Sequence, residues 1–474
     1  MLRRFLDSPI TYFVGAALLV VIAIATQIEV RVPPLPEGTP QDIVGLPRRG
    51  DLNIVFVVVD TLRADHLDAY GYERETSPNL TALASQGIRF ERVLSQSSWT
   101  KTSMASLWTG VAPLNHGLLR FDDALPAEAR MPAEILKRAG YRTAGVIRNG
   151  WVAPNFGFDQ GFDLYLRPRP GRERLQAQSR HPAGPILEGT DEDVLTSASE
   201  FLDAFGSEKF LLYLHFMDVH QYVYDEESPA FGASYLDYYD QSIHWTDRII
   251  AHVYGKLEEI GVLDRTIFVV TSDHGEAFRE HGFEGHARNL YAEVAYVPWI
   301  IGLPFRLMQP VVVEQLVSSI DVWPTLLELL GLPPLEGIDG RSAVPLIHAA
   351  AGLDAEALAP TPQIAFVDRA WGRSDHSIPI MAVEADGKRI MWWPETDEGP
   401  ERVQLFDTES DALEQHDIYR ADDPDARRLL DLARERFETG ESPWGVDAHR
   451  IEIDEMRLNQ LRALGYALPG ETRR

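Results

Sequence analysis

The chain of 474 residues contains no cysteine, which excludes disulfide bonds and thiolate metal sites. Basic residues are also scarce, because 44 lysines and arginines stand against 72 aspartates and glutamates, and the formal charge is −28. Binding to nucleic acid depends mainly on clustered lysine and arginine, so this charge balance argues against a nucleic acid partner. A bound metal ion can still create a local positive site for an anion.

Long apolar runs are missing from the sequence except near the N-terminus. Arg3 and Arg4 precede residues 10–24, which are almost wholly apolar. We interpret residues 1–30 as a membrane anchor or a signal peptide, and both readings stay open because Ala23-Ile24-Ala25 fits a cleavage site. Basic residues that flank an apolar segment tend to stay in the cytoplasm. We therefore expect the rest of the chain to lie outside the cytoplasm, either anchored by a single span or secreted. Residues 31–50 contain five prolines and are predicted to be an extended linker.

Three further apolar segments are predicted to be strands buried on both faces of one sheet. Each is followed by side chains that can bind metals or transfer protons. In open α/β sheets, ligands bind outside the carboxyl ends of the parallel strands, so we expect these side chains to converge. The segments and the residues that follow them are 53–59 with Asp60, 210–216 with His220, and 266–270 with Asp273 and His274.

Residues 97–110 combine hydroxyl side chains in their first half with small and apolar side chains in their second half. We predict that the second half forms a short helix, and we take Thr100 as a nucleophile. A threonine hydroxyl is nearly inert at neutral pH, so it needs an activating partner, and metal coordination is sufficient. Asp60, Asp273, His274 and the Thr100 oxygen then form four ligands to one divalent metal ion. Because the set includes an imidazole, zinc or manganese is favoured over calcium.

Four further residues are candidates for the same site. Lys101, beside Thr100, and Asn149, just beyond the predicted strand 143–147, are expected to bind the substrate. His220 follows its strand as Asp60 and Asp273 follow theirs, and His286 lies on a glycine-rich loop, so both are expected to belong to the site. A second metal site built from Asp218, His220 and His286 stays possible.

Several motifs, in this order, resemble the sulfatase branch of the alkaline phosphatase superfamily. The resemblance implies an α/β fold with a large mixed, mostly parallel central sheet between helices, followed by a smaller C-terminal antiparallel-sheet subdomain. We therefore expect a catalytic domain at residues 51–375 and a C-terminal subdomain at residues 376–474. The motifs are Asp60 after three valines, residues 106–110 (SLWTG), 139–143 (AGYRT), 157–163 (GFDQGFD), 215–220 (HFMDVH), 272–276 (SDHGE), 291–298 and 321–325 (DVWPT).

One departure from the sulfatase pattern concerns the nucleophile. Sulfatases use a formylglycine made from the first residue of Cys/Ser-x-Pro-x-Arg, whereas this chain has Thr100-Lys101-Thr102-Ser103-Met104. The precursor, the proline and the arginine are all missing, and threonine cannot become that aldehyde. A threonine ester of phosphate is instead the pattern of the phosphodiesterase, phosphonate hydrolase and phospho-head-group transferase relatives. In the phosphodiesterase relatives an asparagine also holds the phosphate, which the resemblance implies for Asn149, and a simple loop cap is the alternative role. The resemblance also implies that His220 contacts the transferred group or protonates the leaving oxygen, and we expect His286 to hold an oxyanion or the leaving-group oxygen.

The leading hypothesis is an extracytoplasmic, metal-dependent hydrolase of phosphate or sulfate esters that acts through a covalent Thr100 intermediate. Its partners are an anionic ester substrate and, through the N-terminal segment, the membrane. Two alternatives remain: a membrane-anchored transferase of phosphoethanolamine or phosphoglycerol, and a catalytically silent binding protein of the same fold. The second alternative is disfavoured because Asp60, Thr100, Asp273 and His274 are all present.

Overall fold

The structure, a computed structural model, describes residues 35–171, 178–179, 189–369, 377–397 and 399–452. The predicted anchor or signal peptide at residues 1–30 lies outside this range. Among the helices of the described residues, none combines the length and the apolar character needed to cross a membrane.

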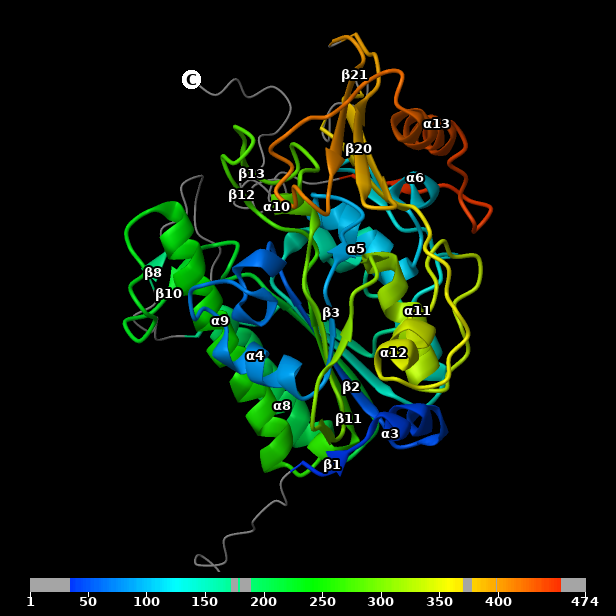
Figure 1. Cartoon of the computed structure of the whole chain (residues 1–474). Coiled ribbons are helices and arrows are strands. Elements are labelled where there is room, and N and C mark those ends of the chain that lie inside the picture. The colour runs from blue at the N-terminus through cyan, green and yellow to red at the C-terminus, as the bar shows by residue number, and fades with distance from the viewer. Residues whose placement is uncertain (1–34, 172–177, 180–188, 370–376, 398, 453–474) are drawn as a thin grey trace, which may run out of the picture.

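An eight-stranded mixed sheet forms the centre of the molecule (Figure 1). Its strand order is β16-β3-β14-β11-β2-β9-β6-β7, and the five strands from β11 to β7 are mutually parallel. Strand β14 runs antiparallel to both of its neighbours. The predicted fold class is thereby confirmed. The strands are β2 (Asn53–Val59), β3 (Ile88–Phe90), β6 (Arg142–Ile147), β7 (Leu164–Leu166), β9 (Phe210–Phe216), β11 (Thr266–Thr271), β14 (Trp299–Gly302) and β16 (Val311–Val313).

Helices cover both faces of this sheet, which explains why β2 is apolar at every position after Asn53. Along β2, Ile54, Phe56 and Val58 pack into one layer, and Val55, Val57 and Val59 pack into the other. The first layer contains α3 (Pro40–Gly45), α5 (Thr100–Thr109), α7 (Pro132–Arg138), α11 (Val322–Leu329) and α12 (Val344–Ala350). The second contains α4 (Pro78–Ser85), α8 (Asp191–Phe205) and α9 (Tyr235–Glu259). Figure 1 shows these two groups of helices on opposite sides of β2 and β11.

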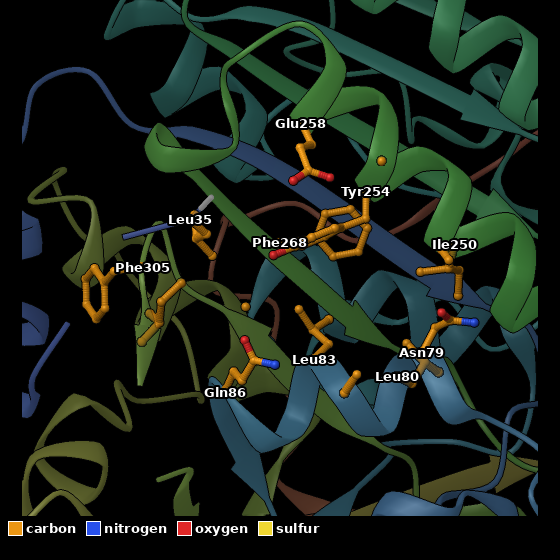
Figure 2. Close-up of a pocket in the computed structure, with 15 residues that line it drawn as sticks. Leu35, Asn79, Leu80, Leu83, Gln86, Ile250, Tyr254, Glu258, Phe268 and Phe305 are labelled. Atoms are coloured by element: carbon orange, nitrogen blue, oxygen red, sulfur yellow. The ribbon is translucent and has the colours of Figure 1, made fainter. Parts of the chain in front are cut away.

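Residues 35–50 do not form the extended linker that their prolines suggested. Pro40 begins α3, where a missing N–H costs nothing, and the side chains of Ile43 and Leu46 are fully buried in the core. The preceding strand β1 (Glu37–Gly38) pairs with β15 (Arg306–Leu307). Leu35 lines an apolar pocket between α4 and α9, with a volume of about 310 Å³ (Figure 2). This part of the chain therefore belongs to the folded body.

A four-stranded antiparallel sheet covered by one helix forms the C-terminal subdomain. Its first strand begins at Gln363, earlier than the expected start at residue 376. Asp386 and Gly387 have positive φ and form the hairpin turn between β19 and β20. The elements are β18 (Gln363–Asp368), β19 (Pro379–Ala385), β20 (Lys388–Trp393), β21 (Arg402–Asp407) and α13 (Pro424–Glu438).

Short elements complete the described chain. The two-residue strands pair as β4 (Val93–Leu94) with β17 (Val317–Ser318), β5 (Asp123–Ala124) with β22 (His449–Arg450), β8 (Gln178–Ser179) with β10 (Val223–Tyr224), and β12 (Ala277–Phe278) with β13 (Glu284–Gly285). The short helices are α6 (Pro113–His116) and α10 (Ala292–Ala295).

Buried His116 is expected to make the fold sensitive to acid. Its Nδ1 accepts a hydrogen bond from the Leu118 N–H at 3.0 Å, and its Nε2 lies 3.0 Å from Ser106 Oγ. Burial lowers the pKa of His116 from 6.5 to about 3, so at intermediate pH the unfolded chain binds a proton that the folded protein does not. The free energy of unfolding should therefore fall as the pH drops below about 6.5, by up to about 1.4 kcal/mol per pH unit from this group.

The variant His116→Asn tests this expectation, because its side-chain oxygen can still accept from the Leu118 N–H. Denaturant unfolding of both proteins should give free energies whose difference shrinks as the pH falls from about 6 to about 4. A difference that stays constant over this range would contradict the assignment of acid sensitivity to His116.

Candidate active site

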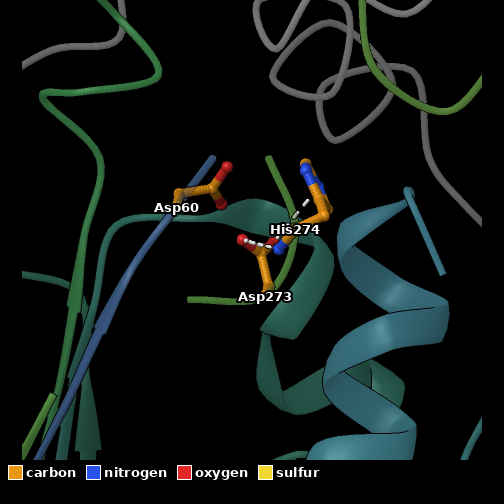
Figure 3. A group of neighbouring side chains, drawn as sticks. All are labelled: Asp60, Asp273 and His274. Carbon is orange, nitrogen blue, oxygen red and sulfur yellow. Dashed lines mark hydrogen bonds and ion pairs between the residues drawn. The ribbon is translucent and has the colours of Figure 1, made fainter. Parts of the chain in front are cut away.

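Asp60, Asp273 and His274 lie together at the carboxyl ends of β2 and β11 (Figure 3). The two strands are parallel neighbours, and the register pairs Val58 with Thr271, so the residues that follow them emerge side by side. One ligand atom from each of the three residues lies within 4.8 Å of the others, and all three side chains are buried. The structure thus brings together three of the four predicted metal ligands.

The two carboxylates of this cluster are only partly hydrogen-bonded. Among the described residues, neither Asp60 Oδ1 nor Asp273 Oδ2 accepts a hydrogen bond, although both are buried, and Asp273 Oδ2 lies 3.3 Å from His274 Nε2. The other oxygens are held: Asp60 Oδ2 accepts from Asn149 Nδ2 at 2.6 Å and lies 3.1 Å from His215 Nε2. Asp273 Oδ1 accepts from the Thr61 N–H at 3.1 Å. Buried carboxylate oxygens without partners are costly, and a bound cation would compensate for them. The donor set therefore fits a divalent metal ion.

Thr100, the fourth predicted ligand, is the first residue of α5. Its Oγ1 lies 3.1 Å from His274 Nε2, and its position at the helix N-terminus favours negative charge on that oxygen. Ser103, one turn further along α5, donates from Oγ to the Asp273 carbonyl oxygen at 2.6 Å, and Ser95 Oγ donates to the same carbonyl. These hydroxyls fasten the start of α5 to the end of β11. They explain why residues 95–103 are rich in serine and threonine.

The two acids of the cluster affect each other's ionisation. Burial raises the pKa of Asp273, and the charge of Asp60 raises it further. Burial also acts to raise the pKa of Asp60, but the hydrogen bond with His215 and the nearby His220 outweigh burial and hold that pKa below its usual value. Two neighbouring carboxylates in a buried site destabilise each other, which again favours a cation between them.

The two predicted catalytic histidines lie against the cluster. The ring centroid of His286 is 4.6 Å from that of His274 and 5.1 Å from that of His220. Gln221 Nε2 donates to His220 Nδ1 at 2.9 Å, which places the proton of neutral His220 on Nε2. Burial is the main cause that lowers the pKa of His220 to about 4 and the pKa of His286 below its usual value. Glu276 Oε2 lies 3.1 Å from His286 Nδ1 and orients that ring.

Lys101 does not face the cluster. Its Nζ donates to the carbonyl oxygens of Phe121 at 2.8 Å and Asp123 at 2.7 Å, and lies 4.2 Å from the centroid of the Phe156 ring. Neighbouring residues on a helix point in different directions, so Thr100 and Lys101 cannot both face the same site. Burial lowers the Lys101 pKa to about 7. The predicted role of Lys101 in substrate binding does not fit this position.

The Asp218 side chain does not face the cluster either. It therefore does not fit the possible second metal site with His220 and His286. Its Oδ1 lies 2.5 Å from Arg148 Nη1, and its Oδ2 accepts from Trp245 Nε1 at 2.8 Å. Asp191 binds the same guanidinium at 2.7 Å. These buried partners commit Asp218 to an ion-pair network.

The side chain of Asn149 makes two hydrogen bonds, one to the turn that follows it and one to a candidate metal ligand. Its Oδ1 accepts from the Trp151 N–H at 2.8 Å, as a cap of the following turn, and its Nδ2 donates to Asp60. The amide thus orients a candidate metal ligand. Its predicted contact with the substrate stays a prediction.

Two residues that sequence reasoning missed shape the site. His215 is a polar residue in the otherwise apolar strand β9, which is the signal that could have identified it, and it binds Asp60. Thr61 has a φ of 61°, a strained value for a β-branched residue, and this conformation directs its N–H toward Asp273. Ala287, next to His286, has a φ of 59°. Such strain is typical of functional sites.

Known proteins resemble this chain over most of its length. The protein-family model described as Sulfatase matches residues 52–332. An ulvan-active sulfatase of Formosa agariphila is 25% identical over 62% of this chain and 65% of its own length. Human arylsulfatase A is 27% identical over 62% of this chain and 67% of its own length. An N-acetylgalactosamine-6-O-sulfatase of Bacteroides thetaiotaomicron is 23% identical and covers 80% of this chain and 92% of itself. The chain therefore spans slightly less than two thirds of the first of these relatives.

Solved structures share the fold at lower identity. A 2-O glycosaminoglycan sulfatase has a TM-score of 0.65 at 17% identity, and the match covers 82% of this chain and 91% of that one. The phosphonate monoester hydrolase of Agrobacterium radiobacter has a TM-score of 0.63 at 19% identity. This match covers 82% of the present chain and 95% of the hydrolase chain.

Proposed function

This chain belongs to the sulfatase family and is a sulfatase-like hydrolase, and from that premise we propose that it cleaves phosphate or sulfate esters through a covalent intermediate on Thr100. The observation that carries the proposal is the position of the Thr100 hydroxyl. It lies at the N-terminus of α5, 3.1 Å from His274 Nε2 and beside two acids that each have one buried oxygen with no hydrogen bond among the described residues. A nucleophile, metal-type donors and a helix N-terminus thus meet at one point.

The chain's own residues supply most of the chemistry. A divalent metal ion held by Asp60, Asp273, His274 and Thr100 would lower the pKa of the hydroxyl and neutralise charge on the transferred group. Thr100 Oγ1 releases its proton to solvent water and attacks the phosphorus or sulfur atom in line. The bond to the leaving ester oxygen breaks as the new bond forms, and its electron pair stays on that oxygen. The N-terminus of α5 favours the negative charge that gathers on the transferred group.

His220 suits a hydrogen-bonding role toward the leaving oxygen. With its pKa near 4 it stays neutral at pH 7, and Gln221 holds its proton on Nε2. A neutral imidazole of this kind stabilises a developing oxyanion by donating a hydrogen bond. Water then attacks the threonine ester and releases the free oxyanion, and His286, oriented by Glu276, can assist this second step.

We infer that phosphoryl esters are the preferred substrates. Thr100 cannot be converted to formylglycine, so the nucleophile is a simple alcohol, and a threonine phosphate ester is a common type of enzyme intermediate in this superfamily. One neighbour of the same fold is a phosphonate monoester hydrolase, which supports this choice. We further propose that the catalytic body lies outside the cytoplasm, because Arg3 and Arg4 precede the apolar residues 10–24.

An assay of the full chain against aryl phosphate diesters, phosphonate monoesters, phosphate monoesters and sulfates tests the substrate class. With Zn²⁺ or Mn²⁺ added, kcat/KM for at least one phosphoryl ester should exceed that for the sulfate by about tenfold or more. A chelator should abolish the activity. Preference for the sulfate would contradict the inferred substrate class, and failure to hydrolyse any ester would contradict the proposed function.

A further inference from the structure

A pocket of about 220 Å³ lies between the loop that carries His286 and the C-terminal antiparallel sheet. Three arginines line it: Arg288 from the loop, Arg369 from the end of β18 and Arg402 from the start of β21. Asn289 and Trp393 also contribute to the wall. Arg288 and Arg369 are half-buried and Arg402 is exposed, so the pocket is accessible from the surface.

The charges of these arginines are not neutralised by direct partners in the described part of the chain. None of the three forms an ion pair with a described carboxylate. Arg288 Nη1 donates to a carbonyl oxygen, that of Glu284, and Arg402 lies 4.4 Å from the Trp393 ring centroid. Asp368 is the acid next to Arg369, but its Oδ2 is paired with Arg120 at 2.7 Å. In a chain with a formal charge of −28, three adjacent arginines are a notable local excess of positive charge.

A buried donor without a partner among the described residues provides a second, independent observation. The side chain of Asn289 is only 1% exposed, its Oδ1 accepts from the Tyr291 N–H, and no described atom accepts from its Nδ2. Within the same described residues, Arg369 Nε is likewise buried without a hydrogen bond. Buried N–H groups are normally satisfied, so these two donors point to a ligand that accepts hydrogen bonds.

The pocket wall and the candidate active site share one loop. Ser98, two residues before Thr100, donates from Oγ to the Asn289 carbonyl oxygen at 2.6 Å. The Ala287 N–H donates to the Ser98 carbonyl oxygen at 2.7 Å. The segment from His286 to Asn289 therefore carries a side chain of the catalytic cluster at one end and the pocket wall at the other.

We propose that this pocket binds a second anionic group of the substrate, a carboxylate or a sulfate, on a ring that packs against Trp393. The inference rests on the proposed function and narrows the substrate to a polyanionic ester. Guanidinium groups bind both carboxylates and tetrahedral oxyanions through paired hydrogen bonds, and the Asn289 amide adds a directed donor. The ester to be cleaved then lies at Thr100 while the second anion fixes the orientation.

A pair of aryl phosphate esters tests the proposal, one with a neutral ring and one with a carboxylate on a flexible tether. The ratio of kcat/KM for the carboxylated ester to that for the neutral ester is the readout. The double variant Arg369→Gln/Arg402→Gln should lower this ratio by about tenfold or more, because hydrogen bonds to charged groups are lost. Arg428→Gln is the matched control, since Arg428 pairs with Asp386 at 2.9 Å on the same subdomain, and it should leave the ratio unchanged.

Binding without turnover separates this inference from the proposed function. Calorimetric titration of Thr100→Ala with the carboxylated ester should give weaker binding when Arg369→Gln and Arg402→Gln are added. If the native chain cleaves neither ester, the proposed function fails and the titration alone decides the role of the pocket. An unchanged ratio together with unchanged affinity would overturn the inference, and so would an equal effect of Arg428→Gln.

Discussion

Replacing Thr100 with alanine is expected to lower kcat by about ten-thousandfold or more, because the variant has no atom that can form the covalent ester. The loss should appear in kcat, since the helix N-terminus and three of the four proposed metal ligands, Asp60, Asp273 and His274, remain. Steady-state hydrolysis of the best aryl ester measures it. Thr100→Ser keeps the hydroxyl and should retain activity to within about tenfold of the native chain.

The matched control for this variant is Thr109→Ala at the other end of α5. Thr109 Oγ1 donates to the Ala105 carbonyl oxygen at 2.7 Å within the same helix. Its removal tests whether loss of any hydroxyl from α5 impairs the enzyme. Turnover by Thr100→Ala equal to that of Thr109→Ala would remove the nucleophile assignment.

Replacing Asp273 with asparagine is expected to weaken binding of the divalent metal ion by about 100-fold or more. The substitution removes a charge and a candidate ligand oxygen from the cluster. It also removes the repulsion between Asp273 and Asp60, so the metal-free variant should melt at a higher temperature than the metal-free native chain. Added Mn²⁺ or Zn²⁺ should then raise the melting temperature of the native chain only.

Asp321→Asn is a suitable control, because Asp321 is another buried acid and accepts from the N–H groups of Ser318 and Arg341. It should lower stability but leave metal binding unchanged. Calorimetric titration with Mn²⁺ and thermal melts of all three proteins provide the measurements. A native chain that binds no divalent ion, or an Asp273→Asn variant with native affinity, would contradict the metal site.

The central sheet and the meeting of Asp60, Asp273 and His274 could be predicted from the sequence. Continuous apolar runs identify strands buried on both faces, and parallel strands bring their carboxyl ends to one edge. The short helix within residues 97–110 could also be predicted from the small and apolar residues of the second half, although the structure begins it earlier, at Thr100. These inferences use local patterns and one general property of α/β sheets.

The directions of individual side chains could not be predicted in this way. Lys101 points into an aromatic wall because of its position on α5, and Asp218 is held by Arg148, a residue distant in the sequence. Residues 35–50 look like a linker by composition, yet Ile43 and Leu46 find apolar partners in the core. Each of these outcomes depends on long-range contacts that composition and periodicity do not encode.

The most direct test of the account is to trap the covalent intermediate. The native chain is mixed with excess ester, quenched in acid within the first turnovers, and digested for mass spectrometry. We expect one phosphoryl or sulfuryl group on the peptide that contains Thr100, with fragment ions placing it on that residue. An adduct on another residue, or complete turnover with no adduct at any quench time while Thr100→Ala remains active, would contradict the central claim.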